Sequence, residues 1–228
     1  ITMILGAVAM TMGFFLNEED AENWSQDELR LLESLSLKNL PHIPDDPSNI
    51  HANEEDAAEL GHALYFDVRM SGNGTVSCAS CHMPEKYFTD GLELAVGTAI
   101  GSRHTPTLVG ISHSPWFYWD GRKDSQWSQA LAPIETQHEH NSSRLEIAQL
   151  IEGDETYRSK YEKVFGVLPP IPDSPTRASP LGDEENLKGW NSLSKNQRAS
   201  VTKVFANVGK ALAAYQRKLI PGQGRFDF

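Results

Sequence analysis

Residues 78–82 read Cys-Ala-Ser-Cys-His, and this stretch decides the fold class. The spacing is that of c-type haem attachment, in which two thiols bond the porphyrin vinyl groups and the adjacent imidazole ligates iron. We therefore expect Cys78 and Cys81 to bind one haem covalently, and His82 to be a ligand of its iron.

Other readings of the two cysteines are weaker. A redox dithiol should stand beside a strand-helix-strand pattern, and a structural zinc site needs a second pair of ligands; neither is visible in the sequence. Two cysteines also cannot form a multi-bridge disulfide framework.

Charge and length limit the class of protein further. The 228 residues include 31 acidic and 20 basic ones, which gives a formal net charge of -11 and disfavours a nucleic-acid partner. An acidic surface favours encounters with basic proteins instead. The length suits one domain with a sizeable core.

The first sixteen residues, 1–16, carry no charge and are mostly apolar. They are interpreted either as an uncleaved membrane anchor or as a signal peptide with Ala7-Val8-Ala9 as its cleavage site. No cluster of Lys and Arg follows the segment, and such a cluster would be needed to keep the chain after it in the cytoplasm. Both interpretations place the remaining chain on the periplasmic side of the membrane.

Helix signals flank the cysteine motif. A capping box of Ser25 and Glu28 opens a short helix, and a proline-rich connector follows at 41–47. Asn53 is the predicted N-cap of a second helix, which leads into the motif. Its apolar stripe consists of Ala57, Leu60, Gly61 and Leu64.

Downstream, residues 68–139 lack helical periodicity and predict long loops folded around the cofactor. Helices are expected at 141–153 and 154–166, then an exposed proline-rich insertion at 167–186, and then the longest helix, from Ser194 to Pro221. The predicted fold is mainly α, a cytochrome c-like haem domain over 53–228, preceded by the membrane segment and by a helix and connector at 17–52.

The sixth position on the iron decides between two functions. Two strong protein ligands favour electron transfer, whereas an open face lets peroxide bind. The sequence offers several candidates for that ligand without favouring one: His42, His51, His62, His104, His113, His138, His140, Met70 and Met83.

Three motifs follow the cysteines in a fixed order: Ser-Arg-His-Thr-Pro-Thr-Leu at 102–108, Trp-Phe-Tyr-Trp-Asp-Gly-Arg at 116–122, and Gln-Ala-Leu-Ala-Pro-Ile-Glu at 129–135. Together they resemble bacterial di-haem cytochrome c peroxidases, and within that superfamily most of all the MauG-type branch. The resemblance is close over 60–145 and weaker over 194–228.

The resemblance implies roles for four residues. Trp119 matches a tryptophan that lies between the two haems of the family, and Glu139 matches the distal-pocket glutamate that acts as acid and base in O–O cleavage. Gln129 and Pro133 match two further residues of the MauG-type distal pocket. The plainer alternatives remain open: Trp119 packs on the porphyrin, Glu139 is a surface residue, and Gln129 and Pro133 lie at a helix end.

The sequence also departs from the family. Residues 97–101 contain no histidine where classical members place a distal one, so we expect an open iron face. A second Cys-x-x-Cys-His is absent, while 224–228 resembles the start of the second haem domain. His104 stands where relatives often have a calcium-binding asparagine, which makes calcium doubtful.

The sequence therefore supports two hypotheses. The first is an extracytoplasmic haem peroxidase whose electrons come from a small cytochrome, a copper protein, or a second haem domain or subunit. The second is a non-enzymatic monohaem cytochrome subunit of a membrane complex. Iron coordination distinguishes them.

Overall fold

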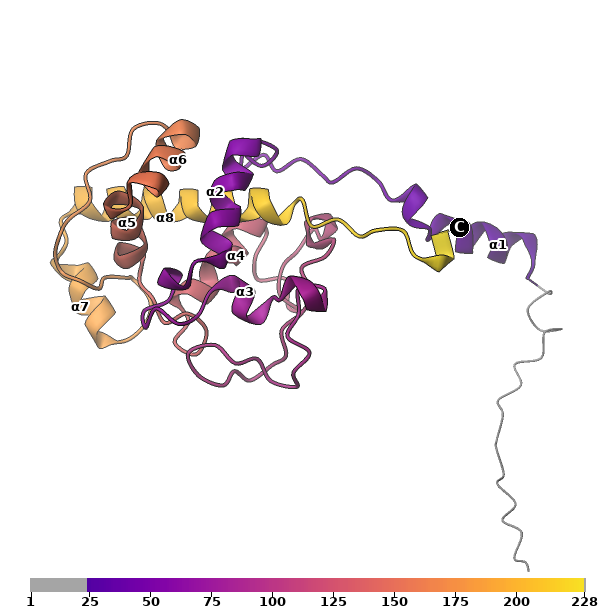
Figure 1. Cartoon of the computed structure of the whole chain (residues 1–228), viewed down its shortest axis with the longest axis horizontal. Helices are drawn as coiled ribbons and strands as arrows, with labels where there is room; N and C mark the ends of the chain where they lie inside the picture. Colours follow the sequence, from indigo (N-terminus) through magenta and orange to yellow (C-terminus); the bar gives the residue numbers. More distant parts are fainter. Residues whose placement is uncertain (1–23, 228) are drawn as a thin grey trace, which may run out of the picture. The chain divides into compact units, whose positions relative to one another are not determined.

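The computed structural model describes residues 24–227, which are mainly helical as predicted; within that range there is no β-strand, only isolated bridges. Two compact units are present, one formed by residues 42–221 and the other by 24–41 with 222–227. The helices, shown in Figure 1, are α1 (Gln26–Ser34), α2 (Glu55–Phe66), α3 (Cys78–Cys81), α4 (Gln126–Glu135), α5 (Arg144–Gly153), α6 (Glu155–Phe165), α7 (Glu184–Ser192) and α8 (Lys195–Gln216).

The smaller unit begins with the predicted capping box. Ser25 Oγ accepts from the Glu28 amide at 3.3 Å, and Glu28 Oε2 accepts from the Ser25 amide at 2.8 Å. The same unit is closed by Asp227, whose carboxylate accepts from the Leu37 amide at 2.5 Å and from Ser36 Oγ at 3.1 Å. The predicted membrane segment, 1–16, lies outside the described residues. No helix within 24–227 is long and apolar enough to cross a membrane.

The core of the larger unit is built where α2 crosses α8 (Figure 1). The predicted stripe of α2 is confirmed, because Ala57, Leu60, Gly61 and Leu64 are all buried. A Cβ added to Gly61 would lie 1.9 Å from the Ala211 carbonyl oxygen of α8. Gly61 therefore allows the two helix backbones to meet directly.

Helix α8 also holds α4, which the sequence did not predict. A Cβ on Gly209 would lie 2.6 Å from Leu131 Cγ and 2.7 Å from the Trp127 carbonyl oxygen. The expectation of loops throughout 68–139 is thus wrong at Gln126–Glu135, because packing against α8 stabilises a helix despite the internal Pro133.

Some predicted helix boundaries are also wrong. The N-cap of α2 is Glu54 rather than Asn53, whose side-chain oxygen instead accepts from Arg217 Nε at 3.0 Å. Helix α5 begins at Arg144, where Ser143 Oγ caps the Glu146 amide at 3.2 Å. The predicted limits of α6 are confirmed, with Asp154 as N-cap and Gly166 at φ 77° as C-cap.

Helix α8 is the longest described helix, as predicted. Ser194 and Gln197 form its capping box, and the helix ends at Gln216, before Pro221.

The proline-rich segment 167–186 is not an exposed insertion throughout. Leu168, Ile171 and Ala178 belong to the main core, and Arg177 donates to the Asn141 carbonyl at 2.8 Å. An irregular backbone can bury side chains without any helical period, so periodicity gave no signal here.

Candidate haem site

The cysteines lie on one short helix, α3. Cys78 and Cys81 are its first and last residues, and side chains three positions apart on a helix share a face. The Ser77 amide donates to Ser80 Oγ at 3.0 Å, which fixes the start of this turn. Both sulfurs are half-buried and neither is in a disulfide, so both are available to a ligand on that face.

His82 follows directly and its ring is oriented by a backbone contact. Its Nδ1 lies 3.0 Å from the Phe88 carbonyl oxygen. A carbonyl can only accept, so Nδ1 carries the proton and Nε2 is left with a free lone pair for a metal. The Tyr65 hydroxyl donates to the His82 carbonyl oxygen at 2.6 Å and anchors the backbone of the same residue.

Burial lowers the pKa of His82, and the carbonyls of Phe88 and Pro106 oppose that shift. The neutral imidazole, which is the form that ligates iron, is therefore favoured. The turn that supplies the Phe88 carbonyl has two consecutive non-glycine residues at positive φ, Tyr87 at 56° and Phe88 at 58°. Backbone strain of this kind is often found at functional sites.

The thiols do not have the properties of a redox dithiol. Burial raises the pKa of Cys78 to about 12, and burial also raises the pKa of Cys81. Redox-active cysteines have a lowered pKa. Two protonated thiols on one helix face, followed by an imidazole with a free Nε2, fit a covalently bound haem.

A second group of polar side chains surrounds Glu139. The Glu139 side chain keeps 42% of its area exposed; its partial burial raises its pKa, and interactions with His138 and Arg122 oppose the shift. The charge of Glu139 in turn contributes to the raised pKa of both Cys78 and Cys81. Glu139 is thus close enough to the haem-binding segment to interact with it electrostatically.

Tyr118 interacts with several members of this group. The Arg122 guanidinium lies 3.5 Å from the centre of its ring, and Arg122 and Gln129 are both close enough to its hydroxyl to lower its pKa. Burial raises the pKa of Tyr118, and the charge of Glu139 adds to the effect. The structure therefore brings together Glu139 and Gln129, which the sequence had selected, with Tyr118 and Arg122, to which it had assigned no role.

The Glu139 backbone is held by the loop at 97–99. The Thr98 amide donates to the Glu139 carbonyl at 2.9 Å, and the Ala99 amide donates to the His138 carbonyl at 3.2 Å. A Cβ on Gly97 would lie 2.5 Å from the Glu139 carbonyl oxygen, so a larger residue cannot fit. In the sequence this loop is distinguished only by its lack of a histidine, and no local pattern indicates its contact with the Glu139 backbone.

Gln129 and Pro133 both lie on α4, four positions apart, rather than at its ends. Pro133 has no N–H, so the Gln129 carbonyl receives no helical hydrogen bond from it.

Trp119 is on the surface, with 81% of its area exposed, and the Arg103 guanidinium lies 5.7 Å from its ring centre. Trp116 is exposed as well, whereas Trp127 is half-buried and donates to Ser48 Oγ at 2.8 Å. The exposure of Trp119 disagrees with the plainer alternative, in which this ring is buried by packing.

Two of the other candidate ligands, His140 and Met70, lie next to each other. His140 is buried and its Nδ1 lies 3.2 Å from the Met70 carbonyl oxygen, while His138 Nε2 lies 3.8 Å from Glu139 Oε1. Met70 is fully buried in the core. Within residues 24–227 no three His, Cys, Asp or Glu side chains are grouped as a metal site would require.

Comparison with known proteins identifies the family. A family model described as di-haem cytochrome c peroxidase matches residues 55–228. The chain belongs to this family. The resemblance inferred from the three motifs is thereby confirmed, and haem c is the cofactor of the family.

The relatives are longer than the chain. The methylamine utilization protein MauG of Methylorubrum extorquens is 32% identical over 170 residues, which cover 74% of this chain and 39% of that protein. The cytochrome c551 peroxidase of Nitrosomonas europaea is 34% identical over 113 residues, which cover 49% of this chain and 34% of that protein. The chain thus spans about two fifths of the first relative.

A solved structure shares the fold. It is that of a MauG-like protein associated with microbial copper homeostasis, with a TM-score of 0.59 and 24% identity. The match covers 90% of this chain and 49% of that one. The cytochrome c peroxidase-like fold expected from the sequence is confirmed.

Proposed function

We propose that residues 42–221 form the peroxide-reacting haem domain of a cytochrome c peroxidase or MauG-type protein, which reduces hydrogen peroxide with electrons from a protein donor. The observation that carries the proposal is the position of Glu139. Its charge contributes to the raised pKa of both thiols of the haem-binding segment, which supports an acid-base role for Glu139 at the cofactor.

Three residues hold the haem in this proposal. Cys78 and Cys81 bond it covalently, and His82 offers Nε2 as the ligand, its other nitrogen being fixed by the Phe88 carbonyl. When bound, the haem would supply an iron that can accept peroxide and pass to it the electrons of the donor.

Glu139 acts as the acid and base. It takes the proton from the near oxygen of peroxide and returns it to the far oxygen, so that water leaves. A raised pKa suits both steps, because the group must gain and lose a proton near the working pH. Gln129 would act on the Tyr118 hydroxyl, whose pKa also responds to Glu139, and Pro133 would limit the space available next to the haem.

Trp119 passes oxidising equivalents outward. Its exposure supports this role, because a relay to another protein or domain has to reach the surface. Trp119→Phe should leave the reaction with peroxide unchanged and slow donor oxidation. Donor oxidation at the original rate would show that Trp119 is not a relay.

The location and partners follow the same proposal. The apolar segment 1–16 directs the soluble part to the periplasmic side and tethers it there. The donor is a small cytochrome or copper protein, or a second haem domain or subunit, and neither nucleic acid nor structural calcium is expected. Fractionation of cells that express the chain tests the location.

The deciding experiment is the electron paramagnetic resonance spectrum of the oxidised chain at neutral pH, with haem per chain measured on the same sample. A high-spin signal from one haem supports an exchangeable iron face and the peroxidase. A purely low-spin signal means two strong ligands and supports the non-enzymatic electron-transfer subunit. A chain without covalent haem would contradict both.

A further inference from the structure

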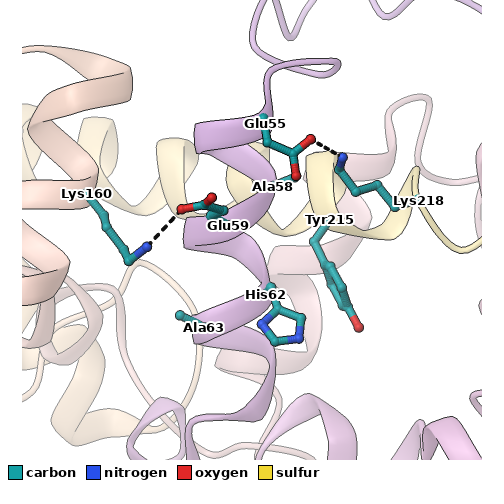
Figure 2. Close-up of a pocket in the computed structure, with 8 residues that line it drawn as sticks. All are labelled: Glu55, Ala58, Glu59, His62, Ala63, Lys160, Tyr215 and Lys218. Carbon is teal, nitrogen blue, oxygen red and sulfur yellow. Dashed lines mark hydrogen bonds and ion pairs between the residues drawn. The ribbon is translucent and has the colours of Figure 1, made fainter.

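A pocket of about 390 Å³ is lined by residues of α2, α6 and α8 and by Lys218, just beyond the end of α8 (Figure 2). One wall is aromatic, because the rings of His62 and Tyr215 meet edge to face with centroids 5.0 Å apart. Ala58 and Ala63 of α2 add small side chains to its lining. A flat ring fits such a recess.

The charges around the pocket cancel. Lys160 Nζ lies 3.2 Å from Glu59 Oε2, and Lys218 pairs with Glu55 at the other end (Figure 2). Two carboxylates and two ammonium groups give the rim no net charge, while the chain as a whole is strongly acidic and repels anions. The pocket therefore favours a neutral aromatic molecule, whose hydroxyl can donate to a rim carboxylate.

The pocket is connected to the haem-binding segment by two tyrosines. The ring of Tyr215 lies 5.0 Å, centroid to centroid, from that of Tyr65, which is fully buried. The Tyr65 hydroxyl reaches the His82 carbonyl at 2.6 Å. Successive contacts thus lead from the pocket through Tyr215 and Tyr65 to His82.

We propose that this pocket binds a neutral phenolic reductant, and that Tyr215 and Tyr65 pass its electrons to the haem held by His82; the proposal rests on the peroxidase function above. Each phenol gives up one electron through the tyrosines and its hydroxyl proton to the water of the open pocket, and becomes a phenoxyl radical. Two phenols thus supply the two electrons that reduce one hydrogen peroxide. With two protons taken from solvent, two waters form.

Tyr161 provides a matched control for the two tyrosines. It is also fully buried, but its hydroxyl accepts from Asn207 Nδ2 at 2.8 Å and its ring contacts Phe165 rather than Tyr65. Tyr→Phe removes the oxidisable hydroxyl in each case and leaves the packing of the ring.

The first measurement is electron paramagnetic resonance of the haem-loaded full chain, frozen after addition of peroxide without donor. A tyrosyl radical signal is expected, lost in Tyr215→Phe and retained in Tyr161→Phe. Tyr65→Phe serves as a second variant and should also abolish the signal. Retention of the full signal in both Tyr215→Phe and Tyr65→Phe would overturn the proposal.

The second measurement is calorimetric titration of the same protein with guaiacol in the absence of peroxide. Loss of one aromatic wall in His62→Ala should weaken binding by about tenfold. Binding that does not depend on His62, or reduction by a small cytochrome but not by guaiacol, would overturn the pocket assignment. Haem absorption that does not respond to peroxide in the unmodified chain would instead contradict the peroxidase function itself, and the pocket proposal with it.

Discussion

The helical frame formed by α2, α4, α5, α6 and α8 differs from the haem-side loops, defined as residues 67–125, in how it is held together. The frame buries nearly all of its large apolar side chains in one cluster, with direct backbone contact at Gly61. The haem-side loops expose Tyr87 and Trp119 by 80% and 81% and are joined by side-chain hydrogen bonds. The frame has a core of its own, whereas the loops fit a segment that encloses a cofactor.

Gly61→Val should break the frame and has the largest expected effect. Its Cβ would overlap the Ala211 carbonyl, so α2 and α8 would have to separate, at a cost of about 4 kcal/mol or more in the free energy of unfolding. Urea denaturation followed by circular dichroism measures this. Gly153→Ala on α5 is the control, because a Cβ there meets nothing within 4 Å, and it should leave stability unchanged or raise it slightly.

Glu139→Gln should change the chemistry and leave the frame intact. Loss of the acid-base group should slow the reaction with peroxide by about 100-fold, while haem attachment is retained. In the unmodified chain the rate should rise with pH through the raised pKa of Glu139, because the base form takes the first proton; the variant should lack this rise. Stopped-flow absorption measures both.

Glu85→Gln, at an exposed position of a haem-side turn, is the matched control for Glu139. It should react at the original rate with the original pH profile. An equal loss of rate in both variants would show that Glu139 has no special role.

Thr105→Val should loosen the haem-side loops selectively. The Thr105 hydroxyl donates to Asp90 Oδ2 at 2.8 Å, and both residues are buried. Asp90 Oδ1 would still accept from the Leu92 amide at 3.0 Å, but loss of the partner of the buried Oδ2 should cost about 1 kcal/mol. Amide hydrogen exchange should accelerate within 67–125 and change little in α8. Thr202→Val, on the exposed side of α8, should have no such effect; acceleration spread evenly over the frame would contradict the distinction between the two regions.

Asp67 lies where α2 meets the haem-side loops. Asp67→Asn should have a small effect on the free energy of unfolding, and that effect should depend on pH. Burial alone would raise the pKa of Asp67, but hydrogen bonds from Arg69 and Tyr157 outweigh it and lower the pKa. Its contribution to stability is thus present above the unfolded pKa, about 3.9, and is lost as the pH falls through the lower folded value. Asp67→Asn should cost about 1 kcal/mol at neutral pH and lose less stability on acidification. Thermal melts between neutral pH and acid test this; parallel curves for the two proteins would contradict it.

Much of the fold was predictable because its signals are local. Capping boxes at Ser25 and Ser194, the stripe containing Gly61, and the N-cap at Asp154 all depend on neighbours within a few residues. Helix α4 and the buried proline-rich segment were missed, because both are stabilised by contacts with residues far away in the sequence.

The same division applies to the candidate site. Cys78, Cys81 and His82 are adjacent in the chain, so the sequence alone determined the haem-binding motif, and the three later motifs determined the family. Only the tertiary structure brought Tyr118 and Arg122 to Glu139, directed the Phe88 carbonyl to His82, and placed Tyr65 and Tyr215 between His82 and a pocket. The physical reason is that covalent attachment depends on spacing along the chain. The proposed acid-base group and the proposed electron path depend instead on distances that arise only when α2, α4, α8 and the haem-side loops pack together.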